Sequence, residues 1–232
     1  LVPRYSLGTW WSKNTNYTDD NIKIIIEDFD NNEIPLSVIL LDNYWHMRDF
    51  NNKELESGFT FNSTNYTNPI NLIAYLHSKG IHLGLSINPV EGLYPYETRF
   101  EELTKYLKKD ENGIIPFNVL DPLCLDVYFK ILISPLNSIG VDFYWLTTRK
   151  YNNLYLLKHY QFLNQYQYIK NRPLMISRNS DLCEHRYPVL YSGKSIVSWD
   201  TLKKYVFYNL ASANIGGPFY AHDIGGTQKG TE

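Results

Sequence analysis

The chain of 232 residues is long enough for one large domain, and its 44% hydrophobic and 20% charged residues are ordinary for a globular protein. A net charge of −2 argues against an electrostatic role in binding nucleic acid or a membrane surface, and no apolar run is long enough to span a bilayer. Aromatic residues make up 16% of the chain, which suits either a packed core or a ligand with an apolar face.

We expect residues 1–232 to form a single domain. Because the chain both begins and ends abruptly, we expect this domain to be a fragment. The start lies close to a predicted strand and has no signal-peptide pattern, so the chain reads as a piece of a longer protein. Cys124 and Cys183 are too few for a disulfide framework. They fit a reducing compartment, so the location stays unassigned and the cytoplasm is favoured among the alternatives.

Predicted strands and helices alternate along the chain, as judged from apolar periodicity, helix caps and glycine or proline breaks. In chain order they are a strand at 5–11, a helix that begins at Thr18, a strand at 36–41, a helix that begins at Pro69 and stops at Gly80, a strand at 81–87, helices at 94–109 and 121–138, a strand at 141–146, a helix at 154–170, strands at 173–177 and 189–191, a helix at 198–214 and a strand at 218–221.

This alternation predicts a parallel sheet with helices on its faces. Residues 36–41 form an uninterrupted apolar run, which is typical of a parallel strand buried on both sides. An open doubly wound sheet and a closed (β/α)8 TIM barrel both satisfy the pattern. No predicted strand is followed by G-x-G-x-x-G or a P-loop, which favours the barrel, with an eighth strand after the seven present here.

Polar and aromatic residues recur at the carboxyl ends of the predicted strands, where barrels of this kind carry their active sites. Carboxylates and arginine bind hydroxyl groups, and an indole ring covers the apolar face of a sugar, so the set predicts a polyhydroxylated ligand. Taken singly, each residue is equally explained by core packing or a salt bridge. The residues are Trp10 and Trp11, Asp42 to His46, Asn88, Trp145 to Arg149, Ser177 and Arg178, Ser192 to Lys194, and His222 and Asp223.

The sequence predicts no metal site and no cofactor. His77 and His82 fall in different elements, His46 has no histidine partner at helical spacing, and no C-x-x-C is present. A Ser-His-Asp site is not supported by any G-x-S-x-G turn. We therefore expect neither a cofactor nor a nucleic-acid or membrane partner.

The segment His222-Asp223-Ile224-Gly225-Gly226 follows the last predicted strand, and its glycines allow a tight turn close to a ligand. Together with four earlier segments it resembles glycoside hydrolase family 31, the α-glucosidase and α-xylosidase group, over nearly the whole chain. The other similar segments are Pro3 to Trp10, Leu41-Asp42-Asn43-Tyr44-Trp45-His46, Ser177-Arg178, and Ser192-Gly193 with Trp199.

The resemblance implies a barrel that acts on or binds α-linked sugars in carbohydrate metabolism. Members of the family retain configuration, using two carboxylates that stand ~5–5.5 Å apart. The family's W-x-D pattern, whose Asp is the nucleophile, corresponds to Trp145-Leu146-Thr147 and places Thr147 at the nucleophile position. The acid/base Asp of the family corresponds to Lys194 in Ser192-Gly193-Lys194. The substrate-binding positions that the resemblance implies are Asp42, Trp145, Arg178, Trp199, His222 and Asp223.

Both expected catalytic carboxylates are therefore replaced. The Thr147 hydroxyl is a weak nucleophile without a base, and a lysine ammonium such as Lys194 holds its proton too tightly to be a good acid at neutral pH. The positive charge of Lys194 also opposes the charge that develops at the anomeric carbon. These substitutions predict a catalytically impaired glycosidase.

Three hypotheses follow for the function of the chain. The first is a barrel that binds an α-linked sugar without cleaving it. The second is an active α-glucosidase-like hydrolase that uses another carboxylate, such as Asp142 or Asp223. The third is a structural or interaction module whose pocket is closed by Lys194 and has no room for a sugar.

Overall fold

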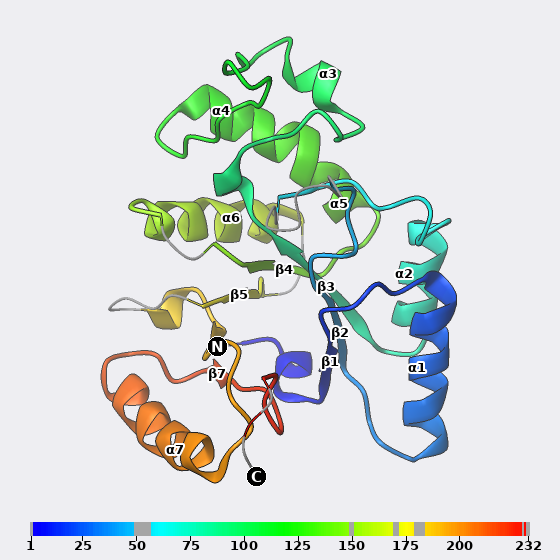
Figure 1. Ribbon diagram of the computed structural model, residues 1–232, viewed down its shortest axis with the longest axis vertical. Coiled ribbons are helices and arrows are strands. Elements are labelled where there is room, and N and C mark those ends of the chain that lie inside the picture. Colours follow the sequence, from blue (N-terminus) through cyan, green and yellow to red (C-terminus); the bar gives the residue numbers. More distant parts are fainter. Residues whose placement is uncertain are drawn as a thin grey trace.

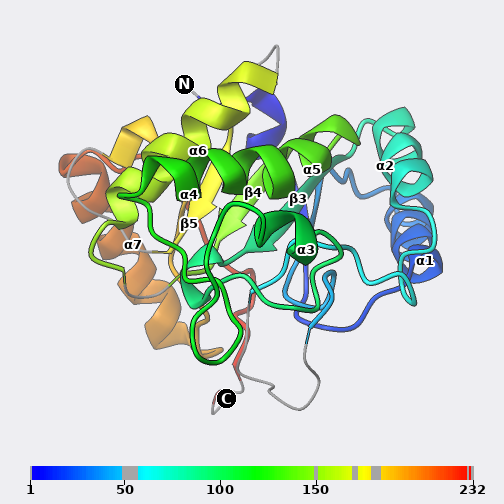
Figure 2. The same ribbon diagram turned by 90° about the horizontal axis from the view of Figure 1, so that it is seen from above.

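The computed structural model describes residues 2–48, 57–148, 151–168, 172–178, 184–228 and 230. Within these residues seven parallel strands form one sheet in the order β1-β2-β3-β4-β5-β6-β7, each paired with the next along the chain. The sheet curves into a half-barrel, with α1 and α2 on one side, α7 on the opposite side, and α4, α5 and α6 between them (Figures 1 and 2). This order confirms the predicted partial TIM barrel and excludes the doubly wound alternative.

The strands are short, and they begin one or two residues later than several of the predicted ones. They are β1 (Trp10–Ser12), β2 (Val38–Leu41), β3 (His82–Ile87), β4 (Phe143–Leu146), β5 (Met175–Ser177), β6 (Leu190–Tyr191) and β7 (Tyr220–Ala221). The helices are α1 (Asp19–Asn31), α2 (Pro69–Ser78), α3 (Phe100–Leu103), α4 (Pro122–Val127), α5 (Ser134–Ser138), α6 (Leu154–Tyr168) and α7 (Trp199–Asn214), with shorter turns at η1 (Arg4–Leu7), η2 (Pro89–Glu91), η3 (Tyr128–Ile133) and η4 (Glu184–Arg186). No helix in the described ranges is both long enough and apolar enough to cross a membrane.

The predicted starts of α1, α2 and α7 are confirmed by their caps. Thr18 forms a reciprocal capping box with Asn21, Pro69 occupies the first turn of α2, and Ser198 accepts a hydrogen bond from the Thr201 amide. Each cap satisfies amide groups that the first helical turn leaves unpaired.

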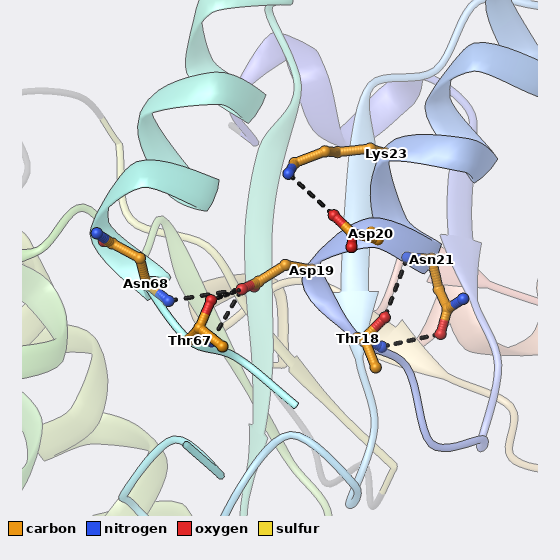
Figure 3. Close-up of polar contacts among 7 residues, drawn as sticks. All are labelled: Thr18, Asp19, Asp20, Asn21, Lys23, Thr67 and Asn68. Atoms are coloured by element: carbon orange, nitrogen blue, oxygen red, sulfur yellow. Dashed lines mark hydrogen bonds and ion pairs between the residues drawn. The ribbon is translucent and has the colours of Figure 1, made fainter. Parts of the chain in front are cut away.

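One carboxylate joins the starts of α1 and α2 (Figure 3). Asp19 Oδ2 accepts hydrogen bonds from the Thr67 amide at 2.9 Å, the Thr67 hydroxyl at 3.0 Å and the Asn68 amide at 3.5 Å. Its neighbour Asp20 instead points to Lys23, 3.2 Å away on the exposed side of α1. Asp19 therefore links the starts of two helices through a contact between residues 48 positions apart in sequence.

The prediction of one strand over residues 5–11 is wrong in its first half. Residues 4–7 form the 3-10 turn η1, in which the Ser6 amide donates to Pro3 and the Gly8 amide donates to Tyr5, each at 3.1 Å. Pairing with β2 begins only at Trp10. Local turn bonds after Pro3 therefore replace the first strand pairings.

The predicted helix over residues 94–109 is reduced to α3, a single turn at 100–103. On its amino-terminal side Leu93 pairs with Ile115 in an antiparallel bridge, and the Glu97 side chain turns inward to the Phe59 amide and the Thr60 hydroxyl. These long-range contacts compete with helical hydrogen bonds, which is why local sequence preference gave the wrong length.

The predicted helix over residues 121–138 is present but not uniform. Asp121 caps α4, the chain widens into the π-helical turn η3, and it continues as α5. Pro135 lies in the first turn of α5 and has no amide hydrogen to donate to the carbonyl four residues earlier. A π-turn immediately before it accommodates the missing bond and the proline ring.

Alternate residues of each strand face two different apolar clusters. The cluster inside the curved sheet contains Val38, Leu40, Phe143, Trp145, Ile176 and Tyr191. The larger cluster, between the sheet and the helices, contains Ile39, Leu41, Leu83, Leu85, Tyr144 and Leu146. This alternation decides which side chains beyond the strand ends point inward.

The sheet ends at β1 and β7, and the β7 edge is apolar. Near it α7 exposes Leu202, Val206, Phe207 and Leu210, and a hollow of 470 Å³ lies between α7 and the chain around Pro218. The predicted eighth strand and the single-domain boundary at residues 1–232 stay predictions.

Candidate functional site

Side chains at the carboxyl ends of β2, β4, β5 and β6 form one pocket, and β3, which lies between β2 and β4, contributes none of its lining residues. The pocket is narrow: its volume of about 20 Å³ holds roughly one water molecule. Its lining residues are Asp42, Asn43, Trp145, Thr147, Arg178, Tyr191 and Lys194. The structure thus brings together five of the residues that the sequence singled out.

The two-residue repeat of the strands explains this convergence. Asp42 continues the inward series of Val38 and Leu40, and Thr147 continues that of Phe143 and Trp145. Arg178 follows Ile176 in the same way at the end of β5. Asp42, Thr147 and Arg178 are therefore each placed by the inward-facing apolar residue two positions earlier.

Arg178 is held against the backbone of Gly193. Gly193 has φ +87°, and a β-carbon at this position would lie 2.6 Å from Arg178 Nη2 and 2.7 Å from Cζ. Two separate features therefore favour glycine at position 193: the positive φ and the close approach of the guanidinium to the backbone. The turn after β6 thus sets the position of the arginine that follows β5.

Tyr191 connects the pocket to Asp223. Its hydroxyl donates a 2.7 Å hydrogen bond to Asp223 Oδ2, and its ring meets the Trp145 indole edge-on at 5.4 Å between centroids. Burial and the neighbouring Asp223 raise the pKa of Tyr191 well above its ordinary value, so the phenol stays protonated and donates. Trp145 Nε1 is buried and has no acceptor among the residues that the structure describes, which leaves one donor in the pocket lining.

Thr147 and Lys194 both line the pocket; Thr147 directly follows β4, and Lys194 lies in the turn after β6. The Thr147 hydroxyl lies 3.4 Å from the Ile87 carbonyl on the neighbouring strand, and only 8% of the residue is exposed. Lys194 is exposed. Among the described residues that line the pocket, Asp42 is the one carboxylate.

Asp223, His222 and Trp199 do not line the pocket. Asp223 reaches it through Tyr191. His222 faces the opposite way, with Nε2 2.7 Å from Asn209 Oδ1 of α7 and its ring stacked on Tyr205 at 4.3 Å. Partial burial lowers the pKa of His222, and Asp223 partly offsets that effect. Trp199 opens α7 and is 69% exposed.

The other strand-end residues serve packing and local bonding. Trp10 packs on Phe143, and its indole donates to the Ser6 carbonyl. Asn88 Oδ1 accepts from the Thr148 hydroxyl at 2.7 Å, beside the pocket but not in its lining. His46 is fully buried, with Nδ1 2.7 Å from the Met47 carbonyl. Arg149 and Cys183 lie outside the described residues, and Cys124 is a buried free thiol.

Sequence reasoning did not single out Tyr191 as a site residue and named Asn43 only within a range. From the sequence, Tyr191 is identified only as a strand residue. Tyr191 lies two positions after Val189, so both side chains face the inside of the sheet. This two-residue spacing is present in the sequence and could have identified Tyr191. Asn43 lies on the other series and enters the pocket because the chain turns after β2, with its amide bonded to Asp42 Oδ1 at 2.8 Å. The sequence has no equivalent signal for it.

His77, His82 and Asp142 converge at the other end of the sheet, although the sequence placed the two histidines in separate elements and predicted no metal site. His77 Nε2 lies 2.9 Å from Asp142 Oδ2, and His82 Nδ1 lies 2.8 Å from Asp142 Oδ1. One potential ligand atom from each residue lies within 4.8 Å of the others. Asp142 precedes β4, so this cluster is separate from the pocket.

The fold and pocket define a parallel β/α barrel with a polar site at the carboxyl ends of its strands. The family described as "Glycosyl hydrolases family 31 TIM-barrel domain" matches residues 1–232. The chain therefore belongs to glycosyl hydrolase family 31, and it corresponds to the barrel domain of that family.

Relatives of the chain include two α-xylosidases. The one from Saccharolobus solfataricus is 24% identical over 261 residues, covering 97% of this chain and 34% of the relative. The one from Emericella nidulans is 22% identical over 259 residues, covering 97% of this chain and 32% of the relative. The chain thus spans about a third of the length of the curated relatives it matches.

Solved structures show the same barrel. A Flavobacterium johnsoniae family 31 dextranase complexed with glucose superposes with a TM-score of 0.77 at 19% identity, covering 98% of this chain and 33% of that one. A family 31 α-xylosidase from a soil metagenome, complexed with xylose, has a TM-score of 0.76 at 18% identity, with 98% and 37% coverage. At these identities the likeness concerns the fold.

Proposed function

We propose that this domain binds an α-linked sugar at the pocket and does not hydrolyse it. The observation that carries the proposal is the composition of the pocket: Thr147 and Lys194 stand beside Asp42, the one carboxylate among its described lining residues. Retaining glycosidases need two carboxylates that face each other across the scissile bond.

The remaining groups suit recognition of hydroxyl groups. The Arg178 guanidinium, which packs against Gly193, offers positively charged hydrogen-bond donors. The Asp42 carboxylate offers negatively charged acceptors. Trp145 adds an aromatic wall and a buried indole N–H that has no acceptor within the described part of the chain. The related structures that contain xylose or glucose support a pentose or hexose as the ligand class.

The small volume of the pocket sets a condition for binding. At about 20 Å³ it does not hold a sugar ring as it stands, so a side chain must move on binding. Lys194 is the natural candidate because it is exposed and carries four rotatable side-chain bonds. Withdrawal of its ammonium group into solvent opens the pocket beside Asp42.

The test is calorimetric titration of the intact protein with methyl α-xyloside and methyl α-glucoside. Saturable binding is expected, and Arg178→Ala should weaken it at least about tenfold, because a charged hydrogen bond contributes about 1.5–3 kcal/mol. Lys203→Ala is the matched control, since Lys203 is an exposed cation on α7 that does not line the pocket. Equal binding by the wild type and Arg178→Ala contradicts the proposed site.

The same narrow volume favours a second candidate, a structural or interaction module with a closed pocket. It predicts no sugar binding even in Lys194→Ala, where the obstructing side chain is removed. The active-hydrolase alternative has less support. Asp142 is bonded to His77 and His82 before β4, and Asp223 stands behind Tyr191 rather than in the pocket lining.

A further inference from the structure

The amino-terminal side of the half-barrel carries a cluster of side chains that the sugar pocket does not use. His77 comes from the last turn of α2, His82 begins β3, and Asp142 immediately precedes β4. We propose that these three residues form a binding site for a borderline divalent cation such as Zn²⁺, independent of the sugar pocket.

The donor set matches this class of metal ion. Two imidazole nitrogens and one carboxylate are the ligands found in three-ligand zinc sites, which leave a fourth position for water. Hard ions such as Mg²⁺ and Ca²⁺ prefer sites made entirely of oxygen. His77 Nε2 and His82 Nδ1 both lie within 3.0 Å of the Asp142 carboxylate, one on each oxygen.

The three ligand atoms, which lie within 4.8 Å of one another, must rearrange on binding. Ligand atoms bound to tetrahedral Zn²⁺ at 2.0–2.1 Å stand about 3.3 Å apart. The two nitrogen-to-oxygen distances are 2.9 and 2.8 Å, so each contact must lengthen by about half an ångström as a cation replaces the shared hydrogens. His77 is exposed, and the other two are partly exposed, which gives an ion access from solvent.

Surrounding groups hold the ligands in place, as the outer shell of a metal site does. The Tyr5 ring stacks on His82 with 3.8 Å between centroids and 20° between planes. The Leu83 amide donates to Asp142 Oδ2 at 2.8 Å, and Gln165 donates to the Asp142 carbonyl at 2.5 Å. Gly140 leaves the space beside His77, since a β-carbon there would lie 3.3 Å from His77 Cε1.

A bound cation would tie together α2, β3 and β4. His77 of α2 and Asp142 beside β4 are 65 residues apart in sequence. Binding only to the folded state stabilises that state by mass action, so Zn²⁺ should raise the melting temperature. Because the sugar pocket lies at the other end of the strands, sugar affinity should not change.

The experiment is calorimetric titration of the intact, metal-free protein with ZnCl₂, together with thermal unfolding. The wild type should take up one Zn²⁺ per chain. His77→Gln, which keeps a hydrogen-bonding amide at an exposed position, should lower the affinity about 10- to 100-fold and abolish the thermal shift. His185→Gln is the matched control, because His185 is exposed and lies outside the cluster.

Cobalt provides a second readout that does not depend on any variant. Co²⁺ bound to two imidazoles and a carboxylate should give visible absorption bands that saturate at one ion per chain and disappear on addition of Zn²⁺. The proposal is overturned if the wild type shows no saturable Zn²⁺ uptake. It is also overturned if His77→Gln binds Zn²⁺ as tightly as the wild type, or if His185→Gln weakens binding as much as His77→Gln does.

Discussion

The Tyr191 hydroxyl donates a 2.7 Å hydrogen bond to Asp223 and thereby connects the last strand of the half-barrel to the pocket. Asp223 comes from the H-D-I-G-G segment that follows β7, and Tyr191 ends β6. The carboxylate that the sequence assigned to sugar binding therefore orients a pocket-lining phenol.

Removal of this bond should destabilise the protein measurably. We expect Tyr191→Phe to lower the free energy of unfolding by about 1–3 kcal/mol, because the partly buried Asp223 carboxylate loses a hydrogen-bond donor. Urea unfolding gives the measurement. Tyr208→Phe is the control: its hydroxyl meets Tyr220 at 2.8 Å in an exposed pair, and its loss should stay within about 0.5 kcal/mol. Equal effects in the two variants would rule out a special role for the Asp223 bond.

Gly193 should be sensitive to substitution for two separable reasons. Gly193→Ala forces a residue with a β-carbon into φ +87° and places that carbon against the Arg178 guanidinium. Gly113→Ala, at φ +77° with nothing within 4 Å, carries the conformational cost alone, about 1–2 kcal/mol. We expect Gly193→Ala to cost about 1–3 kcal/mol more than Gly113→Ala in the free energy of unfolding.

The displaced arginine gives a second readout for the same pair of variants. Sugar affinity should fall in Gly193→Ala and remain at the wild-type value in Gly113→Ala. If both variants lose the same stability and neither loses affinity, the close approach of Arg178 to Gly193 does not matter.

Glu97 should make stability depend on pH in the range from about 4.5 to 7. Burial raises the pKa of Glu97 to about 7, although hydrogen bonds from Thr60 and the Phe59 amide oppose the shift. In this range the folded state keeps a proton that the unfolded state releases. The free energy of unfolding should therefore fall as pH rises from about 4.5 to about 7, by roughly 3 kcal/mol from this group.

Glu97→Gln isolates that contribution, because glutamine resembles the protonated acid and does not ionise. The difference in unfolding free energy between wild type and variant should change with pH in favour of the variant and level off above about pH 7. Urea unfolding at several pH values provides the measurement. A difference that is constant from pH 4.5 to pH 8 would show that Glu97 titrates as an ordinary exposed carboxyl.

Asp19 and Asp20 are adjacent acids in the first turn of α1 with different expected costs. Asp19→Ala should lower the free energy of unfolding by about 1–3 kcal/mol, because it removes the acceptor for the Thr67 amide and hydroxyl. Asp20→Ala loses an exposed pair with Lys23 that contributes less than about 1 kcal/mol. Both variants lose the same favourable interaction with the helix dipole, so the difference between them measures the link to α2.

The sequence predicted most of the fold because strand periodicity and helix caps are local signals. The run Val38–Leu41 and the cap at Ser198 each act within a few residues. The helix expected over residues 94–109 was wrong because a long-range contact, Glu97 with Phe59 and Thr60, competes with helix formation. Such a contact leaves no periodic trace in the chain.

The pocket residues could be predicted where they continue the alternation of side chains between the two faces of a strand. Asp42, Thr147 and Arg178 continue inward-facing series, and His222 lies on the opposite series from Asp223, which explains why it contacts α7 instead. The cluster at Asp142 depends instead on three elements being brought together in space. The spacing of residues along a single helix or strand therefore could not indicate this cluster.

The central claim is that the pocket has kept its sugar-binding groups and lost its catalytic pair. The most direct measurement is p-nitrophenol release from p-nitrophenyl α-xyloside and α-glucoside by the wild type and by the double variant Thr147→Asp, Lys194→Asp. We predict a background rate for the wild type and a gain of at least about 10²-fold in the double variant, since one general acid is worth 10²–10⁴ in rate. Wild-type turnover that is lost in Asp223→Ala but unaffected by Thr147→Ala would contradict the claim.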